Sequence, residues 1–245
     1  SSNSLVTDGS RLYFSEMASG DWVIAQVSST SGETVAIPTP FPTAFLRDLS
    51  PSRSELLVNS GSGLDAPLWV VPVLGGSPRR VGNVQSHAAT WSLDGQQIVY
   101  ANGSTLYLAK SDGTESRELV TVAGRPYWPR WSPDGSHLRF TVRDTAVGSL
   151  NSLWEVAADG SNLHPLLPDW NKPANECCGN WTADGRYFVF QSTRNWKTNI
   201  WALREQAGLF RQASQAPVQL TFGPLNYRAP LPSQDGKRLF VVGEQ

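Results

Sequence analysis

The chain has 245 residues, of which 40% are hydrophobic and 17% are charged, so it is globular and not intrinsically disordered. Its formal net charge of −1 at pH 7 gives no general attraction to nucleic acid or to anionic membranes, and we expect no direct nucleic-acid binding. No stretch approaches the roughly 20 apolar residues of a membrane-spanning helix, so we expect no membrane insertion, and no signal peptide is recognisable at Ser1.

A turn built on Asp-Gly recurs along the chain and divides it into repeats. The turn aspartates are Asp8, Asp94, Asp134, Asp184 and Asp235, and Ser52 takes the place of the aspartate in a degenerate copy. Successive turns are 40 to 51 residues apart. A spacing of this size indicates a repeat fold in which each repeat is one small unit of structure.

Each repeat shows the same order of predicted strands. A first strand ends just before the turn, and a second strand, such as Leu138–Phe140, leaves the turn with β-branched and aromatic residues. A third strand carries an aromatic residue at one fixed place, and a weaker fourth strand follows. The third-strand aromatics are Trp22, Trp69, Tyr107, Trp154 and Trp201.

Four short antiparallel strands per repeat, without helical periodicity, predict an all-β fold, namely a β-propeller made of four-stranded antiparallel blades. We expect six repeats in one domain, residues 1–245, with the last repeat incomplete. The repeats are expected at residues 1–41, 42–84, 85–124, 125–173, 174–223 and 224–245.

The sixth repeat has its first two strands and stops at Gln245. Half a blade would expose a strand edge near Leu239–Val242, which is a pairing hazard. We therefore expect that the chain is a piece of a longer protein, or that another segment or another chain completes the half blade. Completion by another chain would make the protein an oligomer.

The repeated aspartates have a local explanation in turn chemistry. Asp bonds its own downstream backbone and Gly accepts positive φ, so the pair suits a tight hairpin. An acid that returns in every repeat is also a poor candidate for a unique catalytic residue. The adjacent residues Cys177 and Cys178 are expected to be two small unpaired residues, because a disulfide between neighbours closes only a small, strained ring.

The repeated turn and strand residues resemble the WD40-like repeat of the TolB family of β-propellers. The segments that follow the family pattern are Pro129–Gly135, Leu153-Trp154, Asp159-Gly160 and Leu220-Thr221. Propeller domains of tricorn and of prolyl and dipeptidyl peptidases are similar. The resemblance implies a bacterial binding module in the periplasm or another extracytoplasmic compartment, with the cytoplasm as the alternative. It carries over no catalytic residues. The second repeat departs from the pattern because it lacks the Asp-Gly, and the sixth because it lacks the Trp.

Loops before the first strand and between the second and third strands are expected to share one face, where binding sites usually lie. This face is rich in Arg, Trp and Tyr, which are enriched at binding hot spots, and its basic character favours an anionic ligand. The alternative is that these side chains only pack the loops together. The candidate binding residues are Arg47, His87, Tyr127, Trp128, Arg130, Asn180, Arg194, Trp196 and Arg228.

No catalytic, metal or cofactor motif is recognisable, so we expect no enzyme and no cofactor. The leading hypothesis is a non-catalytic propeller that binds a protein or peptide partner, or a small anionic ligand. It would serve as the sensory or interaction part of a larger bacterial protein. The alternatives are the propeller domain of a peptidase and a propeller hydrolase that uses Asp48 and Glu176.

Overall fold

The described residues of the computed structural model are 4–30, 32–61, 63–144, 146, 150–205 and 216–245. They form strands, turns and bends, and this part of the chain contains no helix that is long and apolar enough to cross a membrane. The chain divides into two compact units, residues 1–129 and residues 130–245, and each is described by itself.

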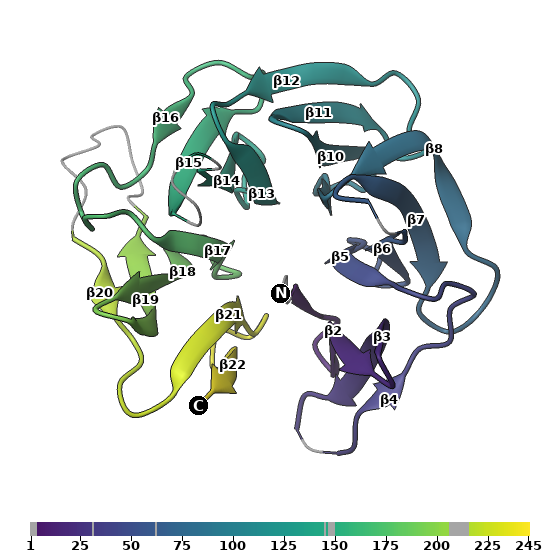
Figure 1. The fold of residues 1–245 in the computed structure, drawn as a ribbon, viewed down its shortest axis with the longest axis horizontal. Coiled ribbons are helices and arrows are strands. Elements are labelled where there is room, and N and C mark those ends of the chain that lie inside the picture. Colours follow the sequence, from purple (N-terminus) through teal and green to yellow (C-terminus); the bar gives the residue numbers. More distant parts are fainter. Residues whose placement is uncertain (1–3, 31, 62, 145, 147–149, 206–215) are drawn as a thin grey trace. The chain divides into compact units, whose positions relative to one another are not determined.

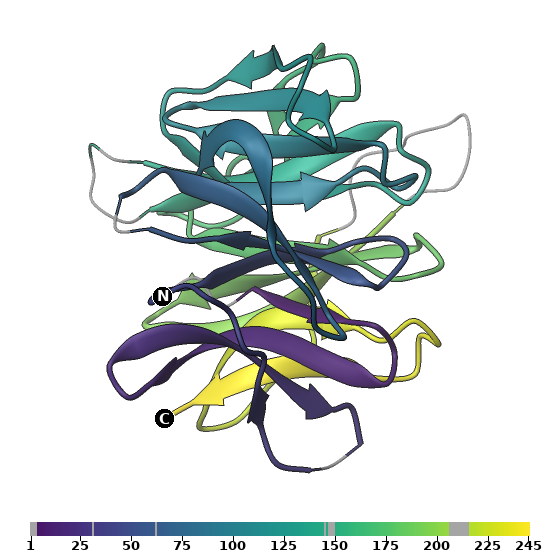
Figure 2. The same ribbon diagram turned by 90° about the vertical axis from the view of Figure 1, so that its right-hand side faces the viewer.

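The first unit contains three four-stranded antiparallel sheets in which strands that follow one another in sequence are neighbours (Figure 1). The first sheet contains β1 (Leu5–Thr7), β2 (Arg11–Ala18), β3 (Asp21–Ser28) and β4 (Val35–Ala36). The second contains β5 (Phe45–Leu49), β6 (Glu55–Asn59), β7 (Ala66–Pro72) and β8 (Arg79–Ser86). The third contains β9 (Ala88–Trp91), β10 (Gln97–Asn102), β11 (Thr105–Lys110) and β12 (Arg117–Thr121). In Figure 2 the purple strands of the first sheet again lie side by side.

The fourth sheet begins with β13 (Arg125–Trp131), within which the boundary between the units falls, and continues with β14 (His137–Arg143), β15 (Asn151–Ala157) and β16 (His164–Pro165). The fifth contains β17 (Glu176–Trp181), β18 (Tyr187–Arg194), β19 (Lys197–Arg204) and β20 (Val218–Gln219). A two-stranded sheet of β21 (Asn226–Pro232) and β22 (Leu239–Glu244) ends the chain.

The prediction of an all-β propeller is confirmed in its architecture. The described residues form five four-stranded blades and one two-stranded sheet, and not six complete repeats. The assignment of the whole chain to one domain stays a prediction.

The repeated turn works as the sequence indicates. In the fourth blade Asp134 Oδ1 accepts hydrogen bonds from the Ser132 hydroxyl at 2.5 Å and from the Ser136 backbone N–H at 3.0 Å. These bonds, with that of Ser132 the strongest, lower the pKa of Asp134 to about 2. The same pattern returns at Asp94, Asp184 and Asp235, so their interpretation as structural residues is supported by the geometry.

The register between second and third strands repeats from blade to blade, with one correction. The residue six positions after the turn aspartate faces an aromatic on the third strand, as Phe140 faces Trp154 and Phe190 faces Trp201. In the first blade the equivalent residue, Phe14, faces Ala25. The prediction that Trp22 is equivalent to the other third-strand aromatics is therefore wrong, because Trp22 lies three residues earlier and pairs with Met17.

The two cysteines also differ from the expectation. Cys177 and Cys178 are joined by a disulfide, and their Cα atoms are 3.8 Å apart. The expectation that these neighbours stay unpaired is wrong, because β17 has an irregular register between Cys177 and Asn180 and a φ of 62° at Cys178. This local departure from strand geometry lets neighbouring side chains meet, which regular alternation would prevent.

The core is formed between the faces of successive sheets within each unit. In the first unit Leu57, Leu68 and Ile98 are fully buried in one such cluster. In the second unit Phe188 and Phe190 of β18 are buried beside Leu153 of the preceding blade. Because both faces of most sheets are covered, the strands are apolar on both sides, which is why their sequences show little alternation.

Candidate functional site

A pocket of about 560 Å³ opens in the second unit beside the turn that joins β18 and β19. One wall comes from this turn, and the other comes from the connection between β16 and β17. The lining residues are Leu150, Trp170, Asn171, Lys172, Pro173, Asn175, Thr193, Arg194, Asn195 and Trp196. Both Arg194 and Trp196 were predicted as binding residues, and the structure brings them to one pocket.

The turn between β18 and β19 has an unusual composition. Arg194 pairs with Lys197, so the loop has two residues, Asn195 and Trp196, with φ values of 50° and 62°. Positive φ at both central positions is typical of a type I′ hairpin turn, which favours Asn followed by Gly. A bulky residue in this conformation is strained. Trp196 is nevertheless 97% exposed, so its ring gains little from burial in the described part of the chain.

The guanidinium of Arg194 lies over two tryptophan rings at the base of the same hairpin. Its guanidinium carbon lies 3.7 Å from the ring centroid of Trp170 and 4.8 Å from that of Trp201. Its Nη2 donates a hydrogen bond to the Trp170 carbonyl oxygen at 2.8 Å. The rings of Trp170 and Trp201 meet edge to face, with their centroids 5.0 Å apart. These contacts fix a positive charge in one orientation beside the pocket.

Two asparagine amides are also fixed at this pocket. Asn171 Nδ2 donates to the Ser192 hydroxyl and to the Thr193 carbonyl, each at 3.3 Å. Asn175 Oδ1 accepts from Asn151 Nδ2 at 3.1 Å. The wall therefore offers amide groups whose positions are set by hydrogen bonds to the neighbouring strands, as specific polar recognition requires.

A buried carboxyl group lies behind the wall. Glu176 is 1% exposed, and its Oε1 accepts from the Asn175 backbone N–H at 3.2 Å and from the Ser192 hydroxyl at 3.5 Å. Burial raises the pKa of Glu176, against the opposing effects of hydrogen bonds from Asn171 and Asn175 and of the Arg194 charge. The carboxyl is thus positioned to support the wall.

We expect Glu176→Gln to stabilise the protein near pH 8 and to have little effect near pH 4. A raised pKa means that the native state binds more protons than the unfolded chain above the ordinary value of 4.5, so stability is lost as pH rises through the raised pKa. Urea unfolding at both pH values measures the effect. An equal change at both values would show that Glu176 does not titrate with folding.

Four predicted residues lie in the first unit. His87 is 4% exposed, and its Nδ1 lies 2.5 Å from Asp65 Oδ1 while its Nε2 lies 2.8 Å from the Pro126 carbonyl oxygen. The rings of Tyr127 and His87 are 4.6 Å apart, and Trp128 lies beside Tyr127 at 5.5 Å. Three of the four candidates, His87, Tyr127 and Trp128, are therefore brought together.

The fourth, Arg47, donates from Nε to Asn59 Oδ1 at 2.6 Å. Asn59 is fully buried and donates to the Ala66 carbonyl and the Ser86 hydroxyl. Arg47 therefore belongs to a hydrogen-bond network that ties strands of the second blade together.

Three further candidates lie in the second unit and do not line the pocket. Arg130 Nε donates to Asn180 Oδ1 at 3.0 Å, and Asn180 Nδ2 donates to the Pro230 carbonyl oxygen at 2.8 Å. Arg228 forms an ion pair with Glu244 at 3.1 Å. These contacts connect β13, β17, β21 and β22, so each side chain has at least one structural partner.

The two acids considered for hydrolysis have structural contacts. Asp48 Oδ2 accepts from the Thr90 hydroxyl at 2.6 Å and from the Trp91 backbone N–H at 3.0 Å, which ties the second blade to the third. Glu176 lies in the other unit. The described residues also contain no group of three or more His, Cys, Asp or Glu side chains that could hold a metal ion.

Sequence reasoning missed Trp170, Asn171 and Asn175. They lie in the connection that follows β16, which has no strand periodicity. One signal could have pointed to them. The turn aspartates Asp134 and Asp184 are 50 residues apart, against 40 for Asp94 and Asp134, so the fourth repeat carries extra residues.

Comparisons with known proteins agree with the blade architecture. No family model matches the chain. One curated relative, dipeptidyl-peptidase 5 from Porphyromonas gingivalis, is 27% identical over 144 residues, which is 51% of this chain and 20% of the relative. The match thus spans about a fifth of the length of that relative.

Solved structures of TolB proteins are similar in fold. A putative TolB from Agrobacterium tumefaciens has a TM-score of 0.68 at 20% identity and covers 86% of this chain and 74% of its own. TolB from Acinetobacter baumannii has a TM-score of 0.67 at 13% identity, and the match covers 89% of this chain and 53% of the TolB chain. An oligogalacturonate lyase in complex with manganese has a TM-score of 0.61 at 15% identity, and the match covers 97% of this chain and 69% of the lyase chain. The chain therefore has the fold of TolB-type β-propellers.

Proposed function

We propose that this chain is a non-catalytic binding module whose ligand site is the pocket beside Trp196. The observation that carries the proposal is the tryptophan itself, which is 97% exposed and occupies a backbone conformation with a φ of 62°. A bulky side chain in the left-handed region costs about 1–3 kcal/mol, and such strained residues cluster at ligand-binding positions. An exposed aromatic ring at this cost is best explained by contact with a ligand.

The charge of the pocket supports an anionic ligand with a flat face. Its described lining residues include two cations, Lys172 and Arg194, and no acid; Lys172 pairs with Asp169 at 2.9 Å, so Arg194 carries the argument. The Arg194 guanidinium is held at this pocket by its hydrogen bond to the Trp170 carbonyl oxygen and by its contacts with the Trp170 and Trp201 rings, so its positive charge has a fixed position. A carboxylate would complement Arg194, while an aromatic or similarly flat group would stack on Trp196. A peptide or a small molecule can carry both groups.

Titration with N-acetyl-phenylalanine and with its amide tests this site. We expect saturable binding of the carboxylate with a Kd of about 1 mM, the affinity that roughly 0.3 kcal/mol per non-hydrogen atom gives for so small a probe. The amide should bind at least about tenfold more weakly, because it lacks the charge that pairs with Arg194. Equal binding of the two probes would remove Arg194 from the site.

A second candidate function is that of a propeller domain in a larger peptidase. The similarity to dipeptidyl-peptidase 5 favours this candidate, although the matched segment covers only 20% of that protein. The sequence on either side of this segment in the parent gene tests the candidate. An adjoining peptidase domain would support it, and an adjoining regulatory or anchoring domain would favour the sensory role.

The disulfide supports an extracytoplasmic location, because disulfides persist mainly in oxidising compartments. Alkylation of free thiols in intact cells, followed by mass spectrometry, tests the location. We expect Cys177 and Cys178 to resist alkylation until a reductant is added. Rapid labelling of both residues without reductant would favour the cytoplasm instead.

A further inference from the structure

The disulfide between Cys177 and Cys178 does not have the form of a structural cross-link. It joins adjacent residues, so it closes the shortest loop that two cysteines of one chain can close. The stability that a disulfide adds grows with the length of the loop it closes, so this disulfide adds little. The chain has two cysteines in total, so neither has another partner within it. The pair therefore needs an explanation other than stability.

The backbone that brings the two cysteines together is a feature of the repeat and not a product of the disulfide. In β17, Cys178 and Gly179 lie opposite the single residue Phe190, which makes a β-bulge. In β21, Ala229 and Pro230 form the same bulge. The φ values are 62° at Cys178 and 49° at Ala229, and each residue stands six positions before its turn aspartate. Because β21 adopts this bulge without a cysteine, the bulge does not depend on the disulfide.

A hydrogen bond from the preceding blade holds each of these bulges. The Cys178 backbone N–H donates to Thr141 Oγ1 at 3.2 Å, and the Ala229 backbone N–H donates to Gln191 Oε1 at 2.9 Å. Both acceptors stand seven positions after the turn aspartate of the preceding blade. Neither bond involves a sulfur atom, so both persist when the disulfide is broken.

The second blade contains the same backbone anchor. The Leu46 N–H donates to Ser15 Oγ at 2.7 Å. Leu46 stands six positions before Ser52, and Ser15 stands seven positions after Asp8, which are the turn residues of their blades. An amide held at this place by a side-chain oxygen of the preceding blade thus recurs in three sheets, and one of the three contains the cysteines. The anchor is therefore part of the blade design.

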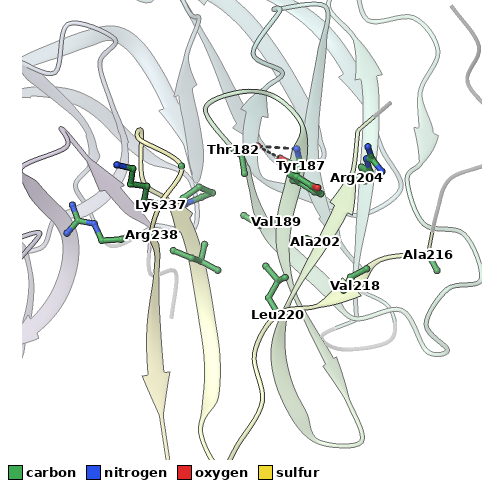
Figure 3. A pocket seen from close by; sticks show the side chains of 13 residues that line it. Thr182, Tyr187, Val189, Ala202, Arg204, Ala216, Val218, Leu220, Lys237 and Arg238 are labelled. Atoms are coloured by element: carbon green, nitrogen blue, oxygen red, sulfur yellow. Dashed lines mark hydrogen bonds between the residues drawn. The ribbon is translucent and has the colours of Figure 1, made fainter. Parts of the chain in front are cut away.

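The residues that flank β17 are also fixed without the sulfur atoms. Before the strand, the Asn175 carbonyl oxygen accepts a hydrogen bond from the Thr193 N–H at 3.0 Å. After the strand, Thr182 Oγ1 accepts from the Tyr187 N–H at 3.1 Å (Figure 3). The Thr182 N–H also donates to the Tyr187 carbonyl oxygen at 2.8 Å. Breaking the sulfur–sulfur bond therefore leaves β17 in place, and the two thiols stay beside each other.

The two cysteines differ in their exposure to solvent. Cys177 is buried, at 7% exposed, whereas Cys178 is partly exposed. Thiol–disulfide exchange begins when a thiolate attacks one sulfur of the disulfide, and the rate depends on access to that sulfur. Cys178 Sγ is therefore the atom that an incoming thiolate attacks, and Cys177 Sγ is the atom that leaves.

We propose that Cys177 and Cys178 form a redox-active site that accepts two electrons from a dithiol. One thiolate of the dithiol attacks Cys178 Sγ, which forms a mixed disulfide and releases Cys177 as a thiolate. The second thiolate of the dithiol then attacks the dithiol's own sulfur in the mixed disulfide and releases Cys178. The two protons that the dithiol loses pass to the two released thiolates. One disulfide is thus reduced and one is formed, and the reverse reaction restores the bond.

This redox site is independent of the pocket beside Trp196. Neither cysteine is among the described lining residues of that pocket, and the reactant is a dithiol. The redox site and the ligand site can therefore be tested separately, and failure of one leaves the other standing.

Equilibration of the whole chain with mixtures of reduced and oxidised dithiothreitol tests the proposal. Free thiols are trapped with N-ethylmaleimide and counted by mass spectrometry, and near-ultraviolet circular dichroism follows the fold in the same samples. We expect the protein to pass reversibly between zero and two free thiols without denaturant, and to keep its folded circular dichroism signal. Reduction should lower the midpoint of urea unfolding by less than about 1 M, because the loop that the disulfide closes is so short.

Two single substitutions locate the sulfur that is attacked, and each variant is the matched control of the other. Cys177→Ser keeps the thiol of Cys178, and Cys178→Ser keeps the thiol of Cys177. In the folded proteins the Cys178 thiol should react with N-ethylmaleimide at least about tenfold faster, because Cys177 is buried. In urea, where both thiols are exposed, the two rates should be similar.

Four results would overturn the proposal. A disulfide that dithiothreitol reduces only in denaturant would be closed to thiols in the folded protein. Loss of the folded circular dichroism signal on reduction would show that the disulfide is structural. Two free thiols that persist in oxidised dithiothreitol would show that the pair does not form a redox couple. Equal alkylation rates of the two folded variants would show that Cys178 is not the preferred point of attack.

Discussion

Replacing Arg139 with alanine is expected to lower the free energy of unfolding of the second unit by about 3–5 kcal/mol. Arg139 is 5% exposed, and its Nε donates to Glu155 Oε2 at 2.8 Å. It also pairs with Glu205 and lies 4.9 Å from the Trp181 ring and 4.7 Å from the Phe188 ring. Its removal leaves the Glu155 carboxylate, itself 6% exposed, without its main partner in a buried site.

Urea unfolding of Arg139→Ala measures this loss, with Arg186→Ala as the matched control. Arg186 is exposed on the neighbouring blade, and its removal should change stability by less than about 0.5 kcal/mol. The double variant Arg139→Met with Glu155→Leu should recover part of the loss, because it removes both buried charges together. A loss below about 1 kcal/mol for Arg139→Ala would mean that solvent screens the pair as it does at the surface.

Replacing Trp196 with glycine is expected to weaken ligand binding and to stabilise the protein at the same time. The turn Asn195-Trp196 would become Asn-Gly, the pair that a type I′ hairpin favours. Relief of the left-handed conformation should raise the free energy of unfolding by about 1 kcal/mol. Loss of the stacking ring should weaken binding of N-acetyl-phenylalanine at least about tenfold.

Trp196→Ala separates the two effects. Alanine also lacks the ring, so it should lose binding to the same extent as glycine. It keeps a Cβ at a φ of 62°, so it should not show the same gain in stability. If both the glycine and the alanine variant are less stable than the wild type, the Trp196 ring supports the fold.

The blades could be predicted because their turns depend on short-range chemistry. The bonds that Asp134 accepts from Ser132 and Ser136 span two residues in each direction. A hydroxyl residue two positions before the aspartate returns at Asp94, Asp184 and Asp235.

The third-strand aromatic could be predicted in the second to fifth blades, although its distance from the turn residue varies between 13 and 20 residues. In the first blade Ala25 stands 17 residues after the turn aspartate, the spacing of Trp69 and Trp201 in their blades, so the equivalent position holds no aromatic residue. Trp22 lies three residues earlier, and only the pairing of Phe14 with Ala25 reveals this.

The pocket could be predicted only in part because it depends on contacts between distant segments. Arg194 and Trp196 could be selected from the sequence because Arg and Trp are enriched at binding sites and both lie in a predicted loop. The role of Trp170 depends on the stacking of Arg194 at 3.7 Å, which joins residues 24 positions apart across an irregular connection. The disulfide between Cys177 and Cys178 was missed for a related reason, since strand periodicity does not reveal the local irregularity in β17.

We infer that the exposed ring of Trp196 contacts a ligand and that its backbone conformation lowers the stability of the fold. Measuring binding and stability together tests this most directly. Wild type and Trp196→Gly are titrated with N-acetyl-phenylalanine by calorimetry and unfolded with urea in the same buffer. We predict at least about tenfold weaker binding together with a stability gain of about 1 kcal/mol. Unchanged binding by the glycine variant would contradict the claim.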